Sequence, residues 1–173
     1  MSSLVFMGVA GCGKSSLAQA VARAEGLPMI EGDDFHPAAN KALMRAGTPL
    51  TDADRDGWLH VLAAQLAAHP GGAVLACSAL KRAYRDALRA ASPGLRFVFL
   101  QIDTESAQRR VNQRAATHFF SATLVASQFS TLEHPAGEAG VLVVDALLPI
   151  DALLRQVRAW LNAHSPSTPG HPA

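Results

Sequence analysis

The feature that most limits what this chain can fold into is the run Gly8-Val-Ala-Gly-Cys-Gly-Lys-Ser15 near its N-terminus. The run satisfies the phosphate-loop pattern G-x-x-x-x-G-K-[ST] in full, with an apolar run before it and a helical pattern after it. Its three glycines allow the backbone to curl, so that successive N–H groups point at one anion, and the following helix presents its positive end to the same anion. The sequence therefore predicts a strand, a phosphate-binding turn and a helix, in that order.

This motif predicts an ATP site with bound Mg²⁺. Lys14 is expected to reach the β- and γ-phosphates, and the Ser15 hydroxyl is expected to ligate the metal. A glycine-rich turn that binds no nucleotide is the weaker alternative, because the motif also has the strand and helix flanks that it requires. The predicted nucleotide-binding residues are Gly8, Val9, Ala10, Gly11, Cys12, Gly13, Lys14, Ser15 and Ser16.

Length and composition indicate a single globular domain over residues 1–164. The chain has 173 residues, of which 49% are hydrophobic and 17% charged, and domains of about 100–200 residues are common. A net charge of +1 argues against broad electrostatic capture of nucleic acid. Two cysteines are too few for a disulfide framework, and no apolar stretch approaches the roughly 20 residues of a membrane span. We therefore expect no nucleic-acid partner, no membrane contact and a cytoplasmic location; residues 165–173, rich in proline, are expected to form a disordered tail.

Short apolar runs alternate with helical patterns along the chain. Near-continuous apolar runs of this length are typical of strands that are buried on both faces, and their alternation with helices predicts a parallel sheet between two helical layers. The predicted fold class is therefore a three-layer α/β/α P-loop NTPase. The predicted strands are residues 4–7, 29–30, 73–77, 97–102 and 141–144, and the predicted helices are residues 15–25, 52–69, 81–91, 105–114, 121–132 and 150–161. Ligands of such folds bind at the carboxyl ends of the strands.

An acidic segment follows the second predicted strand. Glu31 and Asp33 are spaced i, i+2, so both carboxylates are expected to point toward the nucleotide cleft. Phosphoryl transfer to an alcohol needs a carboxylate that accepts the hydroxyl proton, and it needs ligands for Mg²⁺. Asp33 is the predicted base, and Glu31 is predicted to assist the metal. The alternative is that these acidic residues cap a helix that starts near Pro37, a role that suits Asp34 better than Asp33.

Three further blocks resemble the gluconokinase family of P-loop sugar-acid kinases. Residues 31–59 carry G-D-x-x-H-P-x-x-N, G-x-P-L-x-D-x-D-R and W-L, residues 77–89 carry C-S-A-L-K-x-x-Y-R-D-x-L-R, and residues 118–133 carry H-F-F and S-Q-F-x-x-L-E. The resemblance implies a core similar to that of shikimate kinase and adenylate kinase, a sheet of five parallel strands in the order 2-3-1-4-5, a mobile lid at about residues 115–121 and a homodimer. It also implies ATP-dependent phosphorylation of D-gluconate to 6-phosphogluconate.

The resemblance also implies a set of substrate contacts. Gluconate is an anion with several hydroxyls, so its pocket should combine a guanidinium with hydrogen-bonding side chains. Arg55 could instead pair with Asp52 or Asp56 on a helix surface. Lys81 could be an ordinary first-turn residue, although a cation there opposes the helix dipole. The predicted substrate contacts are Asp33, His36, Asn40, Arg55, Ser78, Lys81 and His118.

Cationic side chains precede the predicted lid. Arg114 is predicted to close over the γ-phosphate and to stabilise charge in the transition state, which makes it a catalytic candidate with Lys14 and Asp33. Arg110 is predicted to contact the nucleotide, although it could be a solvated helix charge. The chain departs from the family pattern at Glu31, where the family usually has Asp, and at Thr117, where Gly usually precedes the lid histidine.

Other readings of the nucleotide motif are weaker. A switch GTPase would carry the guanine-reading motif Asn-Lys-x-Asp, and residues 40–43 lack its Asp. A kinase of the same fold with a shikimate-like or nucleoside acceptor remains an alternative, as does a nucleotide-binding module without catalysis.

Overall fold

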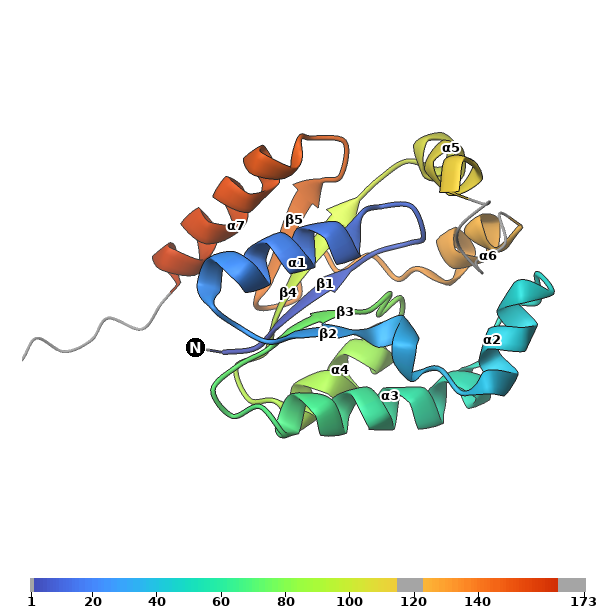
Figure 1. Ribbon diagram of the computed structural model, residues 1–173, viewed down its shortest axis with the longest axis horizontal. Coiled ribbons are helices and arrows are strands. Elements are labelled where there is room, and N and C mark those ends of the chain that lie inside the picture. Colours follow the sequence, from blue (N-terminus) through green and yellow to red (C-terminus); the bar gives the residue numbers. More distant parts are fainter. Residues whose placement is uncertain (1, 115–122, 165–173) are drawn as a thin grey trace, which may run out of the picture.

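The computed structural model describes residues 2–114 and 123–164. The predicted lid at residues 115–121, His118 within it and the predicted tail at residues 165–173 lie outside the described residues. The predicted sheet is confirmed: its five strands are all parallel and lie in the order β2-β3-β1-β4-β5 (Figure 1). The strands are β1 (Leu4–Met7), β2 (Met29–Glu31), β3 (Val74–Ala76), β4 (Arg96–Gln101) and β5 (Val141–Asp145).

The helices lie close to the positions that the sequence predicts, with additions between β2 and α3. A short 3₁₀ helix, η1 (Gly32–Phe35), and the helix α2 (Ala38–Arg45) follow β2 directly. The sequence prediction treated α2 only as a helix that the acidic residues could cap. The other helices are α1 (Lys14–Glu25), α3 (Asp52–Ala67), α4 (Arg82–Ala91), α5 (Thr104–Arg114), α6 (Leu124–Thr131) and α7 (Ile150–Ala163). No helix among the described residues is long and apolar enough to cross a membrane.

The sheet has an apolar core on each face. Side chains alternate across a strand, so Leu4 and Phe6 of β1 pack toward α1 and α7, whereas Val5 and Met7 pack toward α3 and α4. All four residues of β1 are completely buried, which explains why this strand is apolar without alternation. Figure 1 shows the two helical layers on opposite sides of the sheet.

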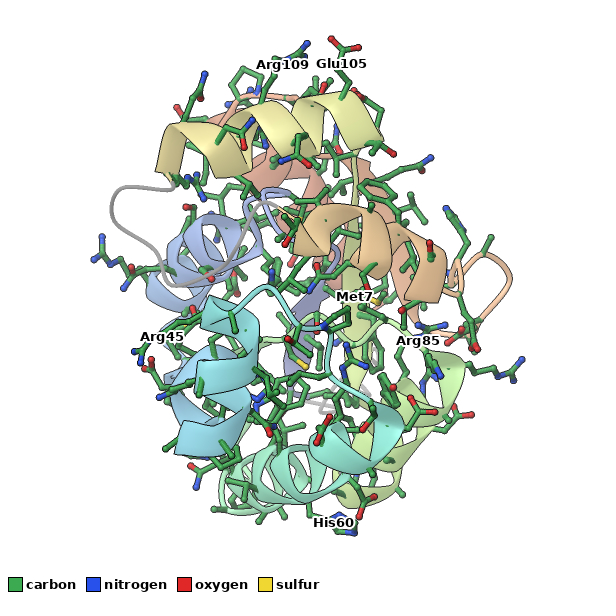
Figure 2. All side chains as sticks on the ribbon, turned by 90° about the vertical axis from the view of Figure 1, so that its right-hand side faces the viewer. Met7, Arg45, His60, Arg85, Glu105 and Arg109 are labelled. Atoms are coloured by element: carbon green, nitrogen blue, oxygen red, sulfur yellow. The ribbon has the colours of Figure 1, made fainter. Side chains whose placement is uncertain are left out.

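The strands β1, β2 and β3 end level with one another at one edge of the sheet. Phe6 of β1 and Glu31 of β2 both pair with Ala76 of β3. The three following loops therefore start side by side, and α2, α5 and α6 surround them at the right of Figure 1. Figure 2 looks onto this edge, with Met7 near its centre.

A methyl group added at Gly32 and one added at Gly57 should have opposite effects on the stability of the protein. A Cβ on Gly32 would lie 2.5 Å from the carbonyl oxygen of Ala76, whereas a Cβ on Gly57 in α3 would meet nothing within 4 Å. We expect Gly32→Ala to lower the free energy of unfolding by about 1–3 kcal/mol through overpacking. Gly57→Ala should raise it by about 0.5–1 kcal/mol through helix propensity. Urea unfolding of both variants measures these changes, and equal effects would contradict the close packing of Gly32, at the start of η1, against β3.

Candidate active site

The phosphate loop connects β1 to α1 in the predicted geometry. Gly13 is the N-cap of α1 and has the left-handed φ of 91°, which glycine adopts without strain. A Cβ on Gly11 would lie 2.7 Å from the carbonyl oxygen of Ala107, so the loop packs directly against α5. The first turn of α1 contains no acidic residue. The helix therefore presents an unopposed positive end to an anion.

Neighbouring segments hold this loop from three sides. The N–H of Gly8 donates to the carbonyl oxygen of Ser78 at 3.3 Å. The N–H of Ala10 donates to Gln128 Oε1 at 2.6 Å. Arg110 Nη1 donates to the carbonyl oxygens of Gly11 and Cys12 at 3.3 and 3.4 Å. The predicted nucleotide contact Arg110 thus supports the loop itself, and it also donates to the carbonyl of Ala146 at 3.0 Å.

The loop forms one wall of a pocket at the carboxyl edge of the sheet. Predicted residues from five separate segments meet there. They are Ala10, Gly11, Lys14, Ser15, Asp33, His36, Arg55, Ser78 and Arg114. The remaining lining is mostly apolar and comes from Met44, Pro49, Leu50, Trp58, Val111, Leu124, Ser127 and Gln128.

Acidic and basic groups face each other on the phosphate side of the pocket. The pKa of Lys14 is raised: burial alone would lower it, but the neighbouring acidic groups, Cys12, Asp33 and Glu31, outweigh burial. Burial raises the pKa of Glu31, and hydrogen bonding from Ser15 opposes the rise. Lys14 is therefore cationic at neutral pH.

Glu31 and Ser15 fit a hard cation. Glu31 Oε1 is a buried carboxylate oxygen that lacks a hydrogen-bond partner in the described part of the chain. A buried oxygen of this kind needs a proton or a cation, and Mg²⁺ takes oxygen ligands. Over the described ranges, the protein does not gather three or more His, Cys, Asp or Glu side chains into a metal cluster. A metal here would therefore complete its shell with phosphate oxygens and water.

Asp33 lies on η1, at the end of β2, with its side chain 47% exposed toward the pocket. The N-cap of α2 is Pro37, which has no side-chain capping hydrogen bond. The alternative that Asp33 or Asp34 caps this helix is therefore wrong. His36 Nε2 lies 4.0 Å from Asp33 Oδ1, so the two side chains form one polar corner.

His36 is buried, with contacts at one face of its ring and at one ring nitrogen. It stacks on Trp58 with ring centroids 4.1 Å apart, and Trp58 Nε1 donates to the carbonyl of Gly32 at 2.8 Å. Asn40 Nδ2 lies 3.4 Å from His36 Nδ1 and donates to the carbonyl of Asp54 at 2.7 Å. The predicted substrate contact Asn40 is buried behind His36 and is not among the residues that line the pocket.

Arg55 projects from the first turns of α3 into the pocket. The helix begins with a capping box between Thr51 and Asp54, which sets its direction. Arg55 Nη1 donates to the carbonyl of Leu50 at 2.7 Å and lies 3.5 Å from the Tyr84 hydroxyl. The alternative partner Asp52 bonds Lys81 and Tyr84 instead.

Lys81 is not among the residues that line the first pocket. Its Nζ donates to both carboxylate oxygens of Asp52 at 2.9 Å. This ion pair offsets the unfavourable place of a cation at the N-cap of α4. Lys81 lines a groove between α3 and α4 with Leu59, His60 and Tyr84, and its contact with substrate stays a prediction.

Comparison with known proteins assigns the chain to a family. The family model described as "AAA domain" matches residues 4–135. The thermoresistant gluconokinase of Escherichia coli is 39% identical over 154 residues, which are 87% of each chain. The gluconokinase of Gluconobacter oxydans is 41% identical over 89% of this chain and 88% of its own. The crystal structure of a gluconokinase from Sinorhizobium meliloti superposes with a TM-score of 0.86 at 44% identity, covering 94% of this chain and 92% of the other.

This chain belongs to the gluconokinase family. The resemblance seen in the sequence motifs is thereby confirmed. Gluconokinases are P-loop kinases, so ATP is the phosphoryl donor of the family.

A second hollow of this gluconokinase-family fold adjoins the phosphate loop on its other side. Arg114 lines both this hollow and the first pocket, so it lies at the border between them. Sequence analysis did not predict the segment after β5 as part of the site. The lining comprises Cys12, Gly13, Ser16, Leu17, Leu100, Arg110, Gln113, Arg114, Ala146, Leu148, Ile150 and Leu153.

Sequence analysis also missed residues of the first pocket in this family member. Gln128 belongs to the S-Q-F-x-x-L-E block that carried the resemblance, but it was assigned no role. Trp58 belongs to the W-L block, and its ring forms the platform for His36. The order of the blocks along the chain was the available signal, because each block contributes residues to the same pocket.

The buried state of His36 predicts a pH dependence of stability. Burial lowers the pKa of His36 from 6.5 to about 4. Between these values the unfolded chain binds more protons than the folded one, so this contribution to stability is present above pH 6.5 and is lost as pH falls toward 4. When the pH is lowered from 7 to 5, we expect the free energy of unfolding to fall by about 1–2 kcal/mol more in wild type than in His36→Gln.

Urea unfolding at the two pH values measures this difference. His60→Gln, at an exposed position of α3, is the matched control and should behave as wild type. Equal pH slopes for His36→Gln and wild type would contradict a neutral, buried His36.

Proposed function

We propose that this protein transfers the γ-phosphoryl group of ATP to the terminal hydroxyl of D-gluconate, giving 6-phosphogluconate and ADP. A bond forms between the hydroxyl oxygen and the γ-phosphorus, and the bond from that phosphorus to the β–γ bridging oxygen breaks. The observation that carries this proposal is that Lys14, Asp33 and Arg55 line a single pocket. The Lys14 ammonium suits a phosphate, the Asp33 carboxylate suits a hydroxyl proton, and the Arg55 guanidinium suits a carboxylate.

On the donor side, the loop N–H groups and Lys14 bind the phosphates of ATP. Ser15 and Glu31 are the residues that would hold Mg²⁺, and the bound ion would neutralise phosphate charge. Because the pKa of Lys14 is raised, the ammonium is already charged when negative charge develops on the transferred group. Arg114 adds a second cation at the border of the two hollows.

On the acceptor side, Asp33 orients the attacking hydroxyl and accepts its proton. The carboxylate is half exposed in the pocket, so it is accessible when substrate enters. Arg55 binds the gluconate carboxylate, which matches a guanidinium in charge and geometry. His36 is neutral at physiological pH. It therefore forms hydrogen bonds with the hydroxyls between the carboxylate and the terminal hydroxyl of gluconate, and it does not act as a second cation.

The nucleoside half of ATP would occupy the second hollow. Leu148 and Ile150 offer apolar contact to a base, and Arg110 lies between this hollow and the loop. Closure of a lid at residues 115–121 with His118, a substrate contact of Lys81, and a homodimer remain predictions of the family resemblance.

A coupled ADP-release assay over a panel of acceptors tests the proposal. With ATP and Mg²⁺, gluconate should exceed related aldonates, shikimate and nucleosides by about 10²-fold or more in kcat/KM, because a pocket built on polar contacts rejects acceptors that leave them unpaired. Omitting the acceptor controls for ATP hydrolysis. A higher rate with shikimate or a nucleoside, or ADP release that does not depend on an acceptor, would contradict the proposal.

A further inference from the structure

The largest fully buried side chain in the described part of the protein is a charged one, Arg85. It lies in the first turn of α4 and is not among the residues that line the pocket. Its charge is balanced by Glu138, whose two carboxylate oxygens both accept from Nε at 3.1 Å. Burial of such a pair is costly unless every donor is satisfied. Arg85 meets this condition by binding two separate turns of the chain.

The first of these turns joins β3 to α4. Arg85 Nη1 donates to the carbonyl oxygens of Ala79 and Leu80 at 2.8 and 3.1 Å. Among the residues that the structure describes, Ala79 is the one non-glycine residue with a positive φ, at 44°. A left-handed alanine persists only where its surroundings impose it. The preceding residue, Ser78, lines the pocket, and its carbonyl accepts the N–H of Gly8.

The second turn follows α6. Arg85 Nη2 donates to the carbonyl of Glu133 at 3.0 Å, and the N–H of Glu133 donates to the carbonyl of Leu80 at 2.8 Å. The helix α6 just before this turn carries Gln128, which accepts the N–H of Ala10. Figure 2 shows Arg85 between α4 and the chain that follows α6.

We propose that Arg85 and Glu138 are positioning residues for phosphoryl transfer, which hold Ser78 and Gln128 at the distance from the phosphate loop that catalysis requires. One guanidinium connects the two segments that bind the N–H groups of Gly8 and Ala10. Lysine cannot replace it, because an ammonium lacks the planar fork that reaches three carbonyls and a carboxylate together. The kinetic part of this inference rests on the proposed function, whereas the structural part does not.

The matched test variants are Arg85→Lys and Arg89→Lys. Arg89 also donates to Glu138, at 2.8 Å, but it approaches from the next turn of α4 and pairs with Asp86. Both variants therefore disturb the same carboxylate, and Arg85→Lys alone releases the two turns. The thermal midpoint of each variant is measured first, and all further measurements are made well below it.

The first readout is amide hydrogen exchange of Gly8 and Ala10 by NMR. Arg85→Lys should accelerate exchange at both amides by about tenfold or more, because their acceptors are no longer held. Arg89→Lys should leave both within about twofold of wild type. If Arg85 only stabilised the fold, Arg85→Lys would not accelerate exchange selectively at these two amides.

The second readout is the split between kcat and KM with gluconate. Arg85→Lys should lower kcat by about tenfold or more, as small displacements at a reacting centre do. KM for gluconate should change less, because Asp33 and Arg55 lie on η1 and α3, and Ser78 is the one pocket-lining gluconate candidate in a turn that Arg85 binds. Arg89→Lys should keep both constants near their wild-type values.

The outcomes separate the positioning role from the alternatives. A lower thermal midpoint with unchanged kcat and unchanged exchange at Gly8 and Ala10 would overturn the proposal. If exchange accelerates but wild type phosphorylates no gluconate, the positioning role stands and the proposed function fails. Should Arg85→Lys not fold, Glu138→Gln provides the same two readouts: a smaller shift in the same direction supports the proposal, and no shift overturns it.

Discussion

Backbone N–H groups that bind phosphate must hold their directions without phosphate, and a turn of small residues has few side chains with which to do so. In this protein the turn is fixed from outside. A carbonyl of the β3–α4 turn, an amide oxygen of α6 and a guanidinium of α5 each bind its backbone. Each of these supports also contributes a wall of one of the two hollows. The geometry of the loop and the shape of the site therefore depend on the same contacts.

The charged groups of the pocket suit the two anionic substrates of the proposed reaction. Lys14 would face ATP and Arg55 would face gluconate, and the Asp33 carboxylate lines the same pocket. Burial keeps His36 neutral, so its imidazole adds no positive charge beside Asp33. In the proposed reaction, Asp33 accepts the hydroxyl proton without a cationic imidazole beside it, and Lys14 is the cationic partner of the phosphates.

Much of this was predictable from the sequence, because the relevant signals are local. The apolar runs identified the strands, and the glycine pattern identified the turn between β1 and α1. Asp33, His36, Arg55 and Ser78 follow strands or begin helices at the same sheet edge, so their meeting in one pocket followed from parallel topology. Their catalytic and binding roles remain predictions.

The parts that were not predictable depend on long-range contacts. Gln128 binds a backbone group 118 residues away, and Arg85 binds turns on two segments; periodicity and spacing carry no information about such partners. Asn40 and Lys81 were predicted as substrate contacts, but in the structure both bind other groups of the protein. Their residue types suit a sugar acid, but the structure places Asn40 against the carbonyl of Asp54 and Lys81 against Asp52.

The central claim is that Asp33 is the base at the meeting point of donor and acceptor, and one comparison of turnover tests it most directly. Asp33→Asn preserves shape while removing charge and basicity, so kcat for gluconate should fall by about 10²–10⁴-fold while ATP binding through the loop persists. The matched control is Asp34→Asn, at the adjacent exposed position of the same 3₁₀ helix, which should keep near-normal turnover. Turnover of Asp33→Asn within about threefold of wild type, well short of the loss expected for a general base, would contradict the account.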